Sequence, residues 1–119
     1  LFRPIHDVTD GVDGFVSLEV SPVLAYDAES TLAQAKQLHA RAGRSNLFIK
    51  IPGTREGIPA IEEAILAGVP INVTLLFSRG HYLAAAEAYM RGIERRIAAR
   101  LNPETRDRIQ PKTSVSIER

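Results

Sequence analysis

The 119-residue sequence predicts an α/β fold in which parallel strands alternate with helices. Segments 15–20, 47–51 and 71–77 have the apolar or period-two pattern of strands, and an amphipathic helical segment follows each of them. Strands that alternate with helices over short connections pair in parallel through right-handed crossovers. The strands recur about every 25 to 30 residues, which suits part of a (β/α)₈ barrel of roughly 250 residues, although a doubly wound open sheet uses similar units.

Each predicted strand has one apolar face. The first strand follows a turn at 10–14 and ends at Ser21-Pro22, because proline cannot donate to a ladder. The second strand contains Lys50, and the third contains Asn72 and Thr74. The apolar faces consist of Val16, Leu18 and Val20; Leu47, Ile49 and Ile51; and Ile71, Val73, Leu75 and Phe77.

The three helices have predicted starts and stops. Asp27 is a plausible N-cap for a helix that runs to about Arg41 and ends at Gly43. The second helix follows the turn at 53–57 and ends at Gly68, and the third runs from Ser78 to about Arg100. Residues 102–104 are typical of the start of a short further helix. Apolar stripes are expected at Leu32, Ala35, Leu38 and Ala42; at Ile58, Ile61, Ile65 and Leu66; and at Leu83, Ala86, Met90, Ile93 and Ile97.

Composition argues against several classes of function. The net charge of +1 gives no electrostatic footprint for nucleic acid or an anionic membrane. No segment approaches the roughly 18 apolar residues of a membrane span, and the first residues lack the charged-then-apolar layout of a signal peptide, so a cytoplasmic location is the expected default. Cysteine is absent and the histidines lack ligand spacing, so we expect no metal site.

The ends of the chain indicate an internal piece of a longer protein. The sequence opens Leu-Phe-Arg-Pro without an initiator methionine, and a strand-like run begins at 113 and stops at 119. We therefore expect residues 1–119 to form a single partial domain with two open sheet edges.

Lys50 is the candidate catalytic residue. An ammonium group is costly to bury in an apolar strand unless it is paired, and a desolvated lysine can attack a carbonyl and form a Schiff base. Period-two alternation places Lys50 on the same face as Glu19, Asn72 and Thr74, opposite the faces expected to meet the helices. A solvated polar face is the alternative, but a fully parallel sheet normally has no wet face.

The neighbours of Lys50 have residue types that suit imine chemistry. Glu19 and Thr74 could hold a water that moves protons, and Asn72 offers a donor and an acceptor to substrate hydroxyls. Each residue also has a purely structural interpretation. Glu19 could simply pair with Lys50, Thr74 could be a β-former, and Asn72 could be a polar residue at a strand edge.

Three blocks together resemble the transaldolase family. They are GFVSLEVSP at 14–22, IKIPGT at 49–54 and INVTLLFS at 71–78, in this order and spacing. The resemblance implies a (β/α)₈ barrel of the pentose phosphate pathway, with these blocks as its third to fifth strands. Such an enzyme transfers a dihydroxyacetone unit between sugar phosphates without a cofactor.

The resemblance also implies roles for residues. Lys50 would form the Schiff base, Glu19 and Thr74 would order the catalytic water, and Asn72 would contact a substrate hydroxyl. The family's acid/base aspartate and an asparagine belong to the first two strands, which are absent here. The sixth strand would carry a serine and an arginine for the substrate phosphate. Glu118 stands where the serine is expected, which leaves Arg119 as a candidate.

Three hypotheses follow. The chain is the central piece of a transaldolase, a piece of a fructose 6-phosphate aldolase-like lyase, or a non-catalytic half-barrel that self-associates through its open edges. The first and third are compatible, because the isolated piece is expected to have little or no turnover.

Overall fold

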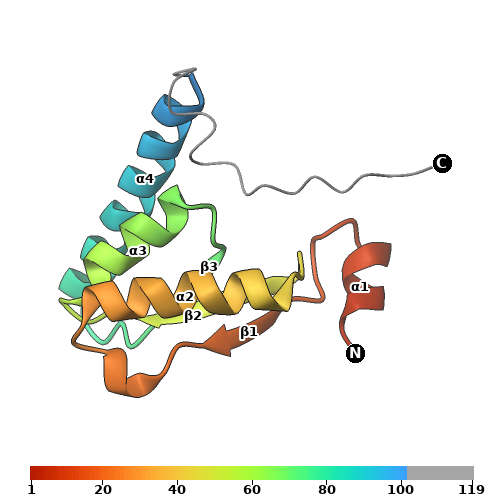
Figure 1. Ribbon diagram of the computed structural model, residues 1–119, viewed down its shortest axis with the longest axis horizontal. Coiled ribbons are helices and arrows are strands. Elements are labelled where there is room, and N and C mark those ends of the chain that lie inside the picture. Colours follow the sequence, from red (N-terminus) through yellow and green to blue (C-terminus); the bar gives the residue numbers. More distant parts are fainter. Residues whose placement is uncertain (102–119) are drawn as a thin grey trace.

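The computed structural model describes residues 1–101, which form a three-stranded sheet and the helices that cover it (Figure 1). The predicted further helix at 102–104 and the strand-like run with Glu118 and Arg119 lie outside these residues. The elements, in chain order, are α1 (Arg3–Val8), β1 (Val16–Glu19), a 3₁₀ turn (Pro22–Leu24), α2 (Ala28–Ala42), β2 (Leu47–Pro52), α3 (Gly57–Leu66), β3 (Ile71–Thr74) and α4 (Arg79–Leu101).

The sheet confirms the predicted fold class. Its order is β1-β2-β3 and both pairs are parallel, with α2 between β1 and β2 in the chain and α3 between β2 and β3. Neighbours in the chain are thus neighbours in the sheet, as in a segment of a barrel. Figure 1 shows α2 running along the sheet, and α3 lying between α2 and α4.

The core lies between the sheet and its helices. Ile49 and Ile51 of β2 are fully buried, as are Ala35 of α2 and Ile61 of α3. The predicted caps of α2 are confirmed, because the Asp27 side chain accepts from the Ser30 amide at 3.0 Å and Gly43 has a left-handed φ of 55°. These local features end α2 where β2 can begin to pair.

Helix α1 was not predicted. Its residue His6 contacts Phe15 edge to face, with ring centroids 5.2 Å apart. Gly14 has a φ of 78°, and a Cβ there would lie 2.7 Å from the Phe2 carbonyl oxygen, so the turn into β1 requires glycine.

The apolar face of β1 is only partly covered. Val20 is buried just after the strand, but Val16 and Leu18 are exposed by 40% and 42%. The reason is the position of β1 at the edge of the sheet, whereas β2 has a neighbour on each side.

The prediction for the third strand was wrong beyond Thr74. The strand ends there because Leu75 has a positive φ of 62°, which breaks the alternation. Leu75 and Phe77 are therefore exposed, by 48% and 82%, while Leu76 packs against the core instead.

The predicted stripe of α4 was wrong for its three largest exposed members. Leu83, Met90 and Ile97 are exposed, whereas the predicted Ala86 and Ile93 are partly buried. The buried residues of this helix include Ala85 and Ala88. Gly92 shows why this face of α4 carries small residues. A Cβ at this position would lie only 2.7 Å from the Glu62 carbonyl oxygen of α3. Small residues let the two helices approach closely, and larger side chains are left facing outward.

Candidate active site

Lys50 lies on the face of β2 opposite the core. Its neighbours Ile49 and Ile51 are buried under the helices, whereas the Lys50 side chain is 32% exposed. This difference in burial follows the alternation of the strand, because successive side chains point to opposite faces of a sheet. The prediction that the polar side chains share the face opposite the helices is confirmed for β2.

Glu19, Lys50 and Asn72 form one row across the sheet. The register pairs Glu19 of β1 with Lys50 of β2, and Lys50 with Asn72 of β3. The Lys50 ammonium nitrogen lies 3.2 Å from Glu19 Oε2, so the two side chains form an ion pair. This contact is the pairing that the sequence offered as a structural alternative, and it also places a carboxylate where a proton from Lys50 could go.

Thr74 lies two residues beyond this row, opposite Pro52 of β2. Its hydroxyl oxygen is buried and has no hydrogen-bond partner among residues 1–101. A buried hydroxyl without a partner costs about 1 to 3 kcal/mol, so this position is an unusual one for a residue with no further role.

Ser17 contacts Asn72 and was not assigned a role from the sequence. Asn72 Nδ2 donates to Ser17 Oγ at 3.1 Å. Alternation along the strand had placed Ser17 on the same face as Glu19. This position could have identified Ser17 as a further candidate site residue.

An aromatic layer lies beside the row, toward the amino ends of the strands. Phe48 is two residues before Lys50 on β2, and its ring stacks on Phe15 at 4.5 Å between centroids. Phe15 also contacts the His6 ring, edge to face. The aromatic layer therefore forms an apolar surface next to Lys50 on the same face of β2, and Phe48 is partly buried in it.

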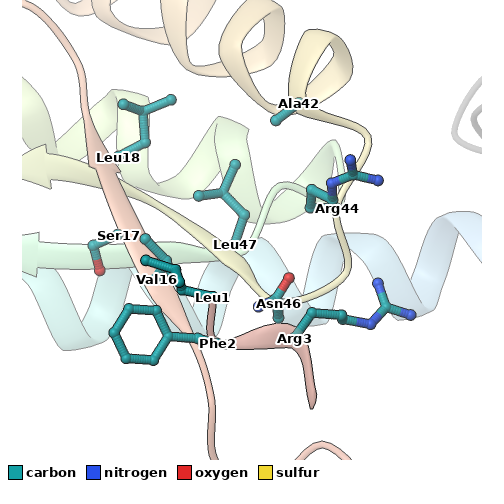
Figure 2. Close-up of a pocket in the computed structure, with 10 residues that line it drawn as sticks. All are labelled: Leu1, Phe2, Arg3, Val16, Ser17, Leu18, Ala42, Arg44, Asn46 and Leu47. Atoms are coloured by element: carbon teal, nitrogen blue, oxygen red, sulfur yellow. The ribbon is translucent and has the colours of Figure 1, made fainter. Parts of the chain in front are cut away.

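A separate cavity of about 370 Å³ lies at the amino end of β1, next to α2. Figure 2 shows Leu18 and Ser17 on opposite sides of β1, with Leu18 and Leu47 on the side of Ala42 of α2. Lys50, Glu19, Asn72 and Thr74 are not among its lining residues. The lining residues are Leu1, Phe2, Arg3, Val16, Ser17, Leu18, Ala42, Arg44, Asn46 and Leu47.

The described part of the chain holds neither a cluster of metal-ligating side chains nor a membrane-spanning helix. Within residues 1–101, no three histidine or acidic side chains gather in a way that could hold a metal ion. None of the helices in this part of the chain is long and apolar enough to cross a membrane.

Comparison with known proteins agrees with the three sequence blocks. The family model for transaldolase/fructose-6-phosphate aldolase matches residues 1–117. A transaldolase of Acidothermus cellulolyticus is 52% identical over 97 residues, which cover 82% of this chain and 26% of the relative. Transaldolase 2 of Nostoc punctiforme is 46% identical over 98 residues, with the same shares. The chain thus spans about a quarter of the length of these relatives, and it belongs to the transaldolase/fructose-6-phosphate aldolase family.

Proposed function

We propose that the chain carries the nucleophile of a transaldolase that moves a dihydroxyacetone unit between sugar phosphates in the cytoplasmic pentose phosphate pathway. The observation that carries the proposal is the row formed by Glu19, Lys50 and Asn72 on the face opposite the core. An amine with a carboxylate on one side and an amide on the other suits a ketone that reacts at Lys50.

Lys50 attacks the ketone after its ammonium group gives a proton to Glu19, whose Oε2 is 3.2 Å away. A bond forms between Nζ and the carbonyl carbon, and the carbonyl oxygen takes up a proton. The attacking nitrogen releases one proton to form a neutral carbinolamine, whose hydroxyl then takes the proton held by Glu19 and leaves as water, which produces an iminium ion. Cleavage of the adjacent carbon–carbon bond then leaves its electron pair on the iminium as an enamine and releases an aldehyde.

The enamine completes the transfer by attacking the acceptor aldehyde, and water then hydrolyses the new imine and frees Lys50. Cleavage requires a base for the proton of the sugar hydroxyl, which the resemblance assigns to an aspartate outside the 119 residues. We therefore expect this chain to form the imine but to have little or no turnover.

Thr74 and Glu19 share the handling of water in this proposal. Dehydration of the carbinolamine and hydrolysis of the imine both move a water, and a carboxylate and a hydroxyl on the strands either side of Lys50 can orient it. The unpartnered hydroxyl of Thr74 supports this role. Asn72 would contact a hydroxyl of the ketone, and Arg119 stays a proposed phosphate ligand outside the described residues.

Borohydride trapping tests the role of Lys50. Incubation of the chain with fructose 6-phosphate and borohydride should reduce the iminium to a stable amine and add the mass of the sugar to the peptide that contains Lys50. Lys50→Ala should abolish the adduct, and the matched variant Lys36→Ala, on α2, should keep it. An adduct that survives Lys50→Ala would contradict the proposal.

The aldolase-like alternative shares Lys50 and differs in the fate of the enamine. In a chain extended to the length of its relatives, transfer to erythrose 4-phosphate would support a transaldolase. Cleavage of fructose 6-phosphate at the same rate with and without that acceptor would support the lyase.

A further inference from the structure

The hydrogen bond between Asn72 and Ser17 crosses the middle strand of the sheet. Asn72 belongs to β3 and Ser17 to β1, and β2 lies between them. Neighbouring strands are about 4.8 Å apart, so the outer two are separated by about 10 Å. Both short side chains must therefore lean inward over β2 for Nδ2 and Oγ to meet at 3.1 Å.

The register shows which residues of β2 lie on either side of this bond. Ser17 is level with Phe48, and Asn72 is level with Lys50. The bond consequently passes over β2 between Phe48 and Lys50, above Ile49, whose side chain is buried on the opposite face. It separates the aromatic layer from the ion pair of Lys50 and Glu19.

This arrangement decides which atoms of Asn72 remain for a ligand. Asn72 is exposed, so packing does not hold its side chain in place. The bond to Ser17 occupies one N–H of the amide and leaves the other N–H and Oδ1. An amide that is fixed before binding loses less conformational entropy when a ligand arrives.

We propose that Ser17 is a positioning residue, whose hydroxyl holds Asn72 over β2 so that its carbonyl oxygen meets a hydroxyl of the ketone bound at Lys50. The inference rests on the proposed function of Lys50. It predicts that Ser17 matters for hydroxylated ketones and is irrelevant to a ketone without hydroxyls.

Trapping of the full chain with two ketones tests this prediction. Ser17→Ala should lower the rate of borohydride trapping at Lys50 by about 3- to 10-fold with dihydroxyacetone, the worth of one hydrogen bond, and leave trapping with acetone unchanged. Ser17→Thr keeps a hydroxyl and should restore the rate. Ser30→Ala removes a serine hydroxyl that bonds Asp27, away from the sheet, and should change neither rate.

Equal losses with both ketones, or no loss with dihydroxyacetone, would overturn the role of Ser17. A second measurement does not depend on Lys50 chemistry. Ser17→Ala should shift the side-chain amide signals of Asn72 in NMR spectra and speed their exchange with solvent, and unchanged signals would overturn the positioning role. Absence of any adduct in the unmodified chain would sink the proposed function instead, and the amide signals would then decide on Ser17.

Discussion

Leu75 combines a bulky side chain with a left-handed backbone directly after Thr74. Its φ is 62°, a conformation that costs roughly 1 to 2 kcal/mol for residues other than glycine. Such strain persists where surrounding contacts enforce it, and here Leu76 is packed against the core on the next position. The strain thus sets the end of β3 at the proposed site.

Leu75→Gly should raise the free energy of unfolding by up to about 1 kcal/mol, because strain relief exceeds the extra freedom that glycine gives the unfolded chain. Urea denaturation measures the change. Leu76→Gly is the matched control and should lose stability, since its side chain packs against the core. Equal losses in both variants would show that Leu75 is not strained.

The residues of the site were predictable where alternation governs them. Lys50 stands between Ile49 and Ile51 in the sequence, and both isoleucines are buried. The alternation of side chains along the strand was therefore enough to predict which face Lys50 occupies. The end of β3 was not predictable in the same way. Leu75 and Phe77 continue the alternating pattern of apolar side chains, and nothing in residue type reveals a left-handed Leu75.

The contact between α3 and α4 is the main feature at the scale of elements. Gly92 allows the close approach, and on the same helices Arg91 and Arg95 bond Glu62 at 2.8 and 2.7 Å. Arg95 also bonds Glu63 at 2.5 Å. Small residues and a charged cluster together hold α4 in place after β3.

Gly92→Ala should destabilise the chain by about 1 to 3 kcal/mol, because its Cβ would press on the α3 backbone at Glu62. Gly80→Ala is a control in the first turn of the same helix, where the new Cβ would meet only Ser78 Oγ, at 3.7 Å. It should gain up to about 1 kcal/mol of helix propensity. Thermal or urea unfolding of both variants compares them, and a Gly92→Ala variant as stable as Gly80→Ala would refute the close contact.

Glu62 makes stability depend on pH. Its hydrogen bond with Arg91, followed by that with Arg95, holds the pKa of the Glu62 carboxyl below its ordinary value of 4.5. A carboxyl with a lowered pKa in the folded state stabilises the fold above its unfolded pKa, and that contribution fades as the pH falls through the folded value.

Glu62→Gln should therefore flatten the loss of stability below about pH 4.5, and cost within about 1 kcal/mol at pH 7 because the arginines are half exposed. Unfolding measured from pH 7 to pH 3 tests this expectation. Glu94→Gln, at an exposed position of α4, is the control and should leave the slope unchanged. Identical slopes in the two variants would count against the role of Glu62.

The existence and bounds of α4 were predictable, but its buried face was not. Periodicity ranks large apolar residues first, which selects Leu83, Met90 and Ile97. The structure instead buries Ala85 and Ala88, which are small enough for close helix packing. Side-chain size at the contact, rather than hydrophobicity, decided the orientation.

At the scale of the whole molecule, apolar side chains are exposed near both edge strands of the sheet formed by residues 1–101. Val16 and Leu18 are exposed beside β1, and Leu75 and Phe77 are exposed after β3. Unpaired edge strands with apolar neighbours favour association with another chain. We propose that the isolated chain self-associates through these edges.

Sedimentation should show a dimer or larger species at micromolar concentration. Leu18→Lys places a charge beside the open edge of β1 and should shift the distribution toward monomer, while Lys36→Glu on α2 should not. A monodisperse monomer of the unmodified chain would contradict self-association.

The register of the sheet links correct folding to the proposed chemistry. A slip of one residue between β1 and β2 would place Leu18 or Val20 beside Lys50 instead of Glu19, and would turn every side chain of the slipped strand to the other face. If β2 were the strand that slips, the ammonium of Lys50 would turn into the core and Ile49 and Ile51 would turn to the opposite face. The hydrophobic core therefore selects the correct register. A misaligned sheet would lose both the packing of its core and the row formed by Glu19, Lys50 and Asn72.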